Sequence, residues 1–101
     1  MKDISVDDLK ERMDKGEPLN IIDVREPWEY EEFNIKGKNM PLSNFMSFIP
    51  ELEDLKNEEV IVHCKMGGRS MQAAGLLEQM GFTNVKNVTG GMDAWKTRFP
   101  G

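Results

Sequence analysis

The sequence holds very few of the side chains that form disulfides or bind transition metals. Among its 101 residues there is one cysteine, Cys64, and one histidine, His63. A single cysteine cannot form a disulfide within the chain, which favours a reducing compartment. One cysteine and one histidine also fall short of the usual ligand sets of a zinc site, so we expect no bound metal.

Long apolar runs and clusters of basic residues are absent as well. No segment approaches the length that crosses a membrane, and the first residues, 1–4, lack the apolar core of a signal peptide. Together with the lone cysteine, this predicts a cytoplasmic protein that does not contact membranes. The 13 basic and 18 acidic side chains give a net charge of −5 without a Lys/Arg cluster, which argues against nucleic acid as a partner.

Short apolar segments alternate with amphipathic ones along the whole chain. We expect strands near Ile4 and at 19–24, 38–40, 60–64 and 85–88. We expect helices from Ser5 to Gly16, at 27–33, in short pieces over 43–55, at 70–80 and at 92–98. This alternation predicts one α/β domain, 1–101, with a sheet of about five mostly parallel strands and helices on both faces.

The short helix at 27–33 carries both apolar and acidic side chains. We predict that Trp28 and Phe33 pack inward. The acidic residues Glu29, Glu31 and Glu32 are predicted to face water or to crowd the helix start, where the helix dipole favours negative charge.

The residues that follow the predicted strand at 60–64 combine a thiol, glycines and a helix start. Cys64 ends the strand, Gly67 and Gly68 follow, and the next helix begins at about Ser70. Helix N-termini and inward-turned loop amides carry partial positive charge, so a thiol held there becomes a nucleophilic thiolate. A buried core cysteine is the plainer interpretation, but the glycines, the helix start and the flanking cations favour a reactive thiolate.

The other residues of this segment receive specific predictions. Lys65 should lie at the mouth of the loop, and Met66 should project from it as an apolar lip. Gly67 and Gly68 should let the loop amides surround the sulfur, because a Cβ at either position would crowd the loop or strain its backbone. Ser70 caps the helix or donates to the sulfur, and capping is the favoured role.

Charged residues on the neighbouring strand lie close enough in the predicted sheet to approach the loop. We expect Arg69 to fix the loop through backbone carbonyls or a carboxylate such as Asp23 or Glu26. Asp23 and Arg25 form a structural ion pair or act directly on a substrate. His63 should point to the opposite face of the sheet from Cys64, so we expect no Cys–His catalytic pair.

Four stretches, spread over nearly the whole chain, resemble the rhodanese family. They are Asp23-Val24-Arg25-Glu26, Asn39-Met40-Pro41-Leu42, the Cys64-Lys65-Met66-Gly67-Gly68-Arg69-Ser70 loop, and Val88-Thr89-Gly90-Gly91 followed by Trp95. The chain departs from the family at Phe33-Asn34-Ile35, where a Gly-His-Ile stretch is common.

The resemblance implies a sulfurtransferase of the thiosulfate or persulfide type. The Cys64 thiolate would take the outer sulfur of thiosulfate or of a persulfide, hold it as a persulfide, and pass it to a thiol or cyanide acceptor. Lys65, Met66, Gly67, Gly68, Arg69 and Ser70 would form the substrate-binding loop, with Asp23 and Arg25 in support. The resemblance implies no metal and no organic cofactor, and it adds a sulfur-relay protein as a further partner.

Two other functions stay open at the level of the sequence. Phosphatases and arsenate reductases of related folds place five residues between cysteine and arginine. Here four residues separate Cys64 from Arg69, and the shorter loop favours sulfur over a tetrahedral oxyanion. A redox-active thiol sensor or binding module is the second alternative, although the chain has no second cysteine to resolve an oxidised Cys64.

Overall fold

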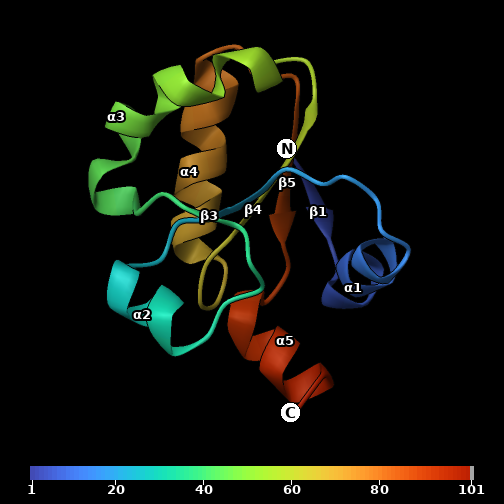
Figure 1. Cartoon of the computed structure of the whole chain (residues 1–101). Coiled ribbons are helices and arrows are strands. Elements are labelled where there is room, and N and C mark those ends of the chain that lie inside the picture. The colour runs from blue at the N-terminus through green and yellow to red at the C-terminus, as the bar shows by residue number, and fades with distance from the viewer. Residues whose placement is uncertain (101) are drawn as a thin grey trace.

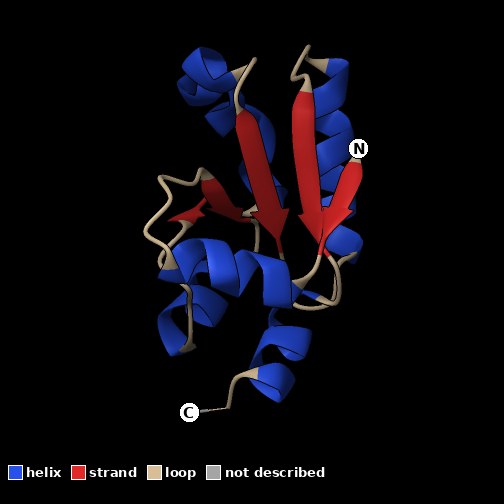
Figure 2. Cartoon of the chain, turned by 90° about the vertical axis from the view of Figure 1, so that its right-hand side faces the viewer, coloured by secondary structure: helices blue, strands red, loops and turns tan. Residues whose placement is uncertain are grey.

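The computed structural model describes residues 1–100, in which five parallel strands form one sheet. The strands are β1 (Lys2–Ile4), β2 (Ile21–Asp23), β3 (Lys38–Asn39), β4 (Glu59–His63) and β5 (Asn84–Val88), in the spatial order β1-β5-β4-β2-β3. Figure 2 shows the arrows of β1, β5 and β4 pointing toward one end of the molecule. The expected α/β fold is confirmed, and the sheet is parallel throughout.

Helical segments cover both faces of this sheet. They are α1 (Val6–Asp14), α2 (Pro27–Glu32), η1 (Leu42–Asn44), α3 (Phe45–Phe48), η2 (Ile49–Leu55), α4 (Gly68–Gln79) and α5 (Gly91–Arg98), the η segments being 3-10 helices. Figure 1 shows α3 and α4 on one side of the strands and α1 on the other. None of the helices within residues 1–100 has the length and apolar character needed to span a bilayer.

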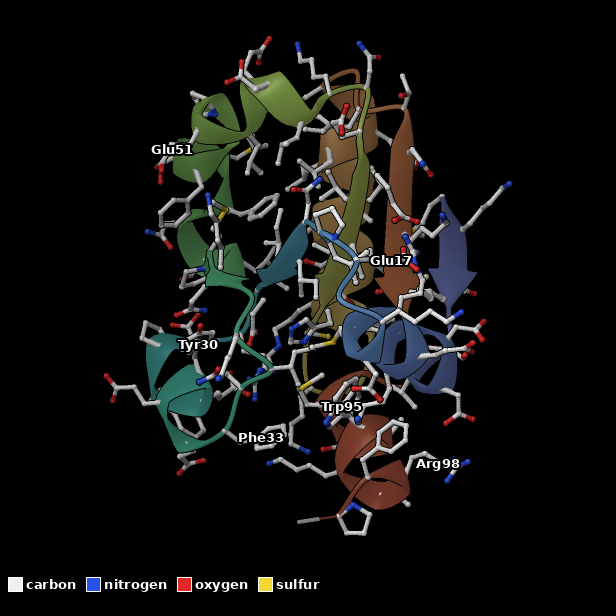
Figure 3. All side chains as sticks on the ribbon, turned by 45° about the vertical axis from the view of Figure 1, so that its right-hand side comes forward. Glu17, Tyr30, Phe33, Glu51, Trp95 and Arg98 are labelled. Carbon is white, nitrogen blue, oxygen red and sulfur yellow. The ribbon has the colours of Figure 1, made fainter. Side chains whose placement is uncertain are left out.

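The two faces bury separate apolar clusters, which explains why the central strands are apolar on both sides. On one face, Val60 and Val62 of β4 pack with residues of α3, η2 and α4. On the other, Ile61 packs with Leu9 of α1 and with Trp95 of α5. Figure 3 shows the labelled Trp95 where α5 meets α1.

The short helix α2 differs from the expected arrangement. Phe33 packs against the second cluster as expected, but the prediction for Trp28 is wrong, because its side chain is 62% exposed. Of the two alternatives predicted for Glu29, facing water is wrong and lying at the helix start is confirmed, because Glu29 lies in the first turn of α2. This carboxylate is buried, since it accepts a hydrogen bond from the Glu26 backbone amide and pairs with an arginine of α4.

The helix after the cysteine begins earlier than expected. Gly67 is its N-cap and adopts φ +120°, and the helix proper starts at Gly68. Ser70 therefore lies inside the first turn, and the prediction that it caps the helix is wrong. Glycine is the residue that reaches this backbone conformation without strain, which is why the helix begins there.

The first turn of α5 lies directly against the backbone that follows β4. The amides of Met92 and Asp93 donate to the carbonyls of Cys64 and Lys65, each at 2.9 Å. A Cβ on Gly91, whose φ is +54°, would clash with the same two carbonyls, meeting the Lys65 oxygen at 2.6 Å. The Gly90-Gly91 pair thus provides the tight helix start expected from the sequence.

We expect Gly91→Ala to destabilise the protein by at least about 2 kcal/mol, because the added methyl group combines a steric clash with left-handed backbone strain. Gly75→Ala is the matched control. Gly75 lies within α4 with open space around it, so alanine there should be neutral or stabilise by up to about 1 kcal/mol. Urea unfolding of both variants measures the difference, and equal effects would contradict the assigned contact.

Candidate functional site

Cys64 lies just beyond the carboxyl end of β4, the strand at the centre of the sheet. In parallel sheets this edge is where ligands bind. The residue is 1% exposed, and its sulfur accepts a hydrogen bond from the Gly67 amide at 3.0 Å. The Ser70 hydroxyl oxygen lies 3.3 Å from the sulfur. The predicted loop around the thiol is therefore present in the structure.

The surroundings of the Cys64 sulfur favour the thiolate. Burial raises the pKa of this thiol, but hydrogen bonds from the Ser70 hydroxyl and from the amides of Ser70, Gly67 and Met66 outweigh burial. The net result is a pKa below the ordinary value of a cysteine. This direction agrees with the prediction that the loop favours the thiolate form of Cys64.

The two loop glycines differ in what they contribute. Gly67 requires glycine because of its positive φ, whereas the space around a Cβ on it is nearly open. Gly68 has an ordinary φ, and a Cβ there would meet nothing within 4 Å. The prediction that a side chain at either position strains or crowds the loop therefore holds for Gly67 and is wrong for Gly68.

Ser70 makes contacts that the sequence alone did not reveal. Its buried hydroxyl lies 3.0 Å from the Gly67 carbonyl and also contacts the side-chain oxygen of Asn87 on β5. Strand alternation places Asn87 on the same face as Val85, in the core beside α4. Asn87 is not among the predicted site residues, although a polar residue at an inward strand position was the available signal.

Arg69 is fixed by a residue other than the expected one. Its guanidinium donates to both carboxylate oxygens of Glu29, at 2.7 and 2.9 Å, so the predicted partners Asp23 and Glu26 are wrong. Arg69 lowers the pKa of Glu29 to about 2, and burial opposes that change. Glu29 also accepts from the Glu26 amide, so this ion pair joins the start of α2 to the Cys64 loop.

Asp23 and Arg25 form a buried ion pair beside the loop. The guanidinium donates to Asp23 at 2.7 Å and to the Phe33 carbonyl at 2.6 Å. Within residues 1–100, the hydrogen bonds of these two side chains do not reach Cys64 or Ser70. Of the two roles left open by the sequence, this geometry favours the structural one.

His63 is buried next to Asp23, and no hydrogen bond joins its ring to the Cys64 sulfur. Its Nε2 lies 3.8 Å from the Asp23 carboxylate, and its two ring nitrogens have no hydrogen-bond partner among the described residues. Burial lowers the pKa of His63 to about 4, so the ring is neutral at pH 7. The arrangement agrees with the expectation that His63 and Cys64 do not act as a pair.

Lys65 and Met66 lie on the outer side of the loop, as expected. Met66 is 69% exposed. The Lys65 ammonium is exposed and lies 2.9 Å from Asp93 of α5, so its charge is partly balanced. A small hollow of about 80 Å³ lies beside Lys65, between α2 and α5, with Trp28 on its wall.

Comparison with known proteins gives a consistent result. The family model for the Rhodanese-like domain matches residues 5–98. The putative sulfurtransferase YtwF of Bacillus subtilis is 41% identical over 98 residues, which cover 95% of this chain and 91% of that protein. Thiosulfate sulfurtransferase PspE of Escherichia coli is 39% identical over 70 residues, which cover 68% of this chain and 67% of that protein.

Solved structures and longer proteins also match. The crystal structure of a rhodanese-like domain protein from Staphylococcus aureus has a TM-score of 0.77 at 34% identity, covering 94% of this chain and 91% of that one. The putative sulfur carrier protein YrkF of Bacillus subtilis is 39% identical over 94 residues, covering 92% of this chain and 50% of that protein. The chain spans 20% to 50% of the length of four curated relatives.

We expect Gly67→Ala and Gly68→Ala to behave differently. Alanine at 67 forces a strained backbone of about 1–3 kcal/mol and displaces the amide that donates to the sulfur, so stability and thiolate reactivity both fall. Alanine at 68 should leave both near the parent values. Thermal unfolding and the rate of alkylation by iodoacetamide at pH 7 measure the two effects. Similar losses in the two variants would contradict this distinction.

We expect Glu29→Gln to cost about 1 kcal/mol at pH 7, because it removes a bidentate ion pair that is partly open to solvent. The folded-state pKa of Glu29, about 2, lies below the ordinary 4.5. The carboxylate therefore stabilises the fold fully above its ordinary pKa, and this contribution is lost as the pH falls toward 2.

Urea unfolding of parent and variant between pH 7 and pH 2 tests this pH dependence. The difference in the free energy of unfolding should shrink across the acidic range. Glu32→Gln, at an exposed position of the same helix, is the control and should show a small difference that does not change with pH. A pH-independent loss in Glu29→Gln would show that the charge of Glu29 is not what stabilises the loop.

Proposed function

This chain belongs to the family of rhodanese-like domains, and on that premise we propose that it is a sulfurtransferase that carries sulfane sulfur on Cys64. The proposal rests on the hydrogen bonds that loop amides donate to the Cys64 sulfur. These bonds lower the pKa of the Cys64 thiol. Relatives named as sulfurtransferases support the same chemistry.

The first step forms the persulfide. The Cys64 thiolate attacks the outer sulfur of thiosulfate, a new S–S bond forms, and the bond to the sulfonate sulfur breaks, so that sulfite leaves with the bonding electron pair. A low-molecular-weight persulfide reacts in the same way and leaves as a thiolate. The charge is conserved, because one thiolate becomes one persulfide anion. The step needs no metal and no organic cofactor.

The second step passes the sulfur on. An acceptor thiolate, or cyanide, attacks the terminal sulfur of the Cys64 persulfide, and the Cys64 thiolate is the leaving group. A low thiol pKa helps here as well, because a more stable thiolate leaves more easily. The acceptor is a small thiol, cyanide or a sulfur-relay protein, and the relative named as a sulfur carrier supports the relay.

The loop residues have distinct proposed roles in this cycle. The amides of Met66, Gly67 and Ser70 hold the negative sulfur. Arg69 fixes the loop through Glu29 and does not bind the substrate.

The remaining residues of the loop, and the two charged residues at the end of β2, also have proposed roles. Gly68 begins α4, Lys65 attracts anionic donors to the mouth, and Met66 forms an apolar lip for a donor or partner. Asp23 and Arg25 form a buried ion pair on the strand next to the loop and support the loop structurally. The engagement of Arg69 with Glu29 also favours sulfur transfer over phosphatase chemistry, since that arginine is not free to bind a tetrahedral oxyanion.

We expect incubation with thiosulfate to add one sulfur atom to Cys64 and incubation with cyanide to remove it. Cys64→Ser should abolish the addition while leaving the fold intact, because the replacement differs little in volume. Intact-mass spectrometry, with peptide mapping of the modified residue, measures the outcome. A folded Ser variant that still accepts sulfur, or a parent protein that accepts none from thiosulfate or a small persulfide, would refute the proposal.

A further inference from the structure

The Ser70 hydroxyl has more acceptors around it than it has hydrogens. Its oxygen lies 3.0 Å from the Gly67 carbonyl and 3.3 Å from the Cys64 sulfur, and it contacts Oδ1 of Asn87. A serine hydroxyl donates only one hydrogen. When this hydrogen points to Asn87, the sulfur does not receive it, although a thiolate at Cys64 needs it most.

We propose that Asn87 is a positioning residue that decides where the Ser70 hydrogen points, and that its side-chain amide turns as Cys64 changes between thiol and thiolate. The proposal rests on the sulfurtransferase function argued above, because that cycle needs Cys64 as nucleophile and as leaving group. Asn87 itself does not touch the sulfur in this assignment. It acts through Ser70.

The chemistry of an amide fits both states of the sulfur. With Oδ1 toward Ser70, Asn87 accepts the hydroxyl hydrogen, and the Ser70 oxygen is free to accept from the Cys64 thiol. With the amide turned about its terminal bond, the NH₂ group donates to the Ser70 oxygen, and the hydroxyl hydrogen is free for the thiolate or persulfide anion. A carboxylate at position 87 would serve only the first state, and an apolar side chain would serve neither.

Burial makes the three side chains dependent on one another. Ser70 and Cys64 are at most 1% exposed, and Asn87 is 4% exposed, so water does not readily replace a lost partner. Unpaired polar groups in such surroundings are costly, and paired ones are stronger than in water. Asn87 also lies in β5 between two parallel neighbours, paired with Asp3 of β1 and Val62 of β4, which fixes the root of its side chain.

The charged groups near Cys64 lie on other elements and stay in place when Asn87 is changed. Arg69 of α4 is paired with Glu29 of α2, and Lys65 is paired with Asp93 of α5. The neutral His63 of β4 lies beside Asp23 of β2, whose partner is Arg25. A change in Cys64 ionisation in an Asn87 variant without a new charge therefore reports the hydrogen bonds through Ser70.

The test is the pH dependence of Cys64 alkylation by iodoacetamide in a cycle of variants. Asn87→Leu removes both donor and acceptor and keeps the branched shape of the side chain. We expect it to raise the Cys64 pKa and to slow alkylation at pH 7 severalfold, because the Ser70 oxygen loses its NH₂ donor and the Gly67 carbonyl competes for the hydroxyl hydrogen. Asn87→Asp should slow alkylation further, by about tenfold or more, because the carboxylate keeps the Ser70 hydrogen and adds negative charge. Thermal unfolding selects the variants that are folded.

The Ser70→Ala background separates a route through Ser70 from a general loosening of the core. In that background Asn87→Leu should leave the Cys64 pKa unchanged, and Asn87→Asp should retain only the smaller shift that its charge causes directly. Asn39→Leu is the matched control, because Asn39 donates to backbone carbonyls of Asp23 and Arg25 and does not contact Ser70. It should leave the Cys64 pKa at the parent value.

The outcomes distinguish this inference from the function on which it rests, since alkylation needs no sulfur donor. Equal shifts with and without the Ser70 hydroxyl, or no shift in a folded Asn87 variant, would overturn the role of Asn87. If Asn87→Leu does not fold, Asn87→Asp, which keeps the shape of the side chain, decides alone by the same comparison. If the Asn87 and Ser70 variants shift the Cys64 pKa as expected, but the protein takes no sulfur from any donor, the role of Asn87 is kept and sulfur transfer is rejected.

Discussion

The contact between the first turn of α5 and the backbone of Cys64 and Lys65 is the constraint on which the site depends. Two α5 amides hold the two carbonyls at 2.9 Å, and Gly91 leaves room for them. The carbonyls of Cys64 and Lys65 point toward α5. The backbone after them turns so that the Gly67 amide faces the sulfur. The Arg69–Glu29 ion pair fixes the other end of the loop against α2. The loop that stabilises the thiolate is thus held by contacts whose partners lie far away in the sequence.

The fold and the position of the reactive thiol could be predicted from the sequence because both are encoded locally. Apolar strands that alternate with amphipathic helices specify a parallel sheet, and in such a sheet Cys64 must lie at the carboxyl edge. The glycines after it mark the turn into α4. These signals depend on residues within a few positions of one another, so they survive without knowledge of the tertiary structure.

The partners around the loop could not be predicted in the same way. Whether Arg69 meets Glu26 or Glu29 depends on how α2 is rotated against α4, and that rotation also exposes Trp28 and buries Glu29. The role of Ser70 depends on where α4 begins. With the N-cap at Gly67 instead of about Ser70, the Ser70 side chain lies on the buried face of the first turn and does not cap the helix. Asn87 illustrates the same limit. It lies on β5, but the residue that it contacts, Ser70, belongs to α4, the helix that follows β4.

The near-complete burial of Cys64 also limits the shape of what reaches it. With the residue 1% exposed, the sulfur offers little surface to an incoming atom, and in-line displacement at sulfur further restricts the direction of approach. A sulfane sulfur at the tip of a thin molecule meets both requirements. The central sulfurs of a bulky disulfide, flanked by carbon on both sides, do not. Under the proposed function, the depth of the thiol would therefore act as a steric filter that separates sulfur donors from ordinary oxidised thiols before any chemistry begins.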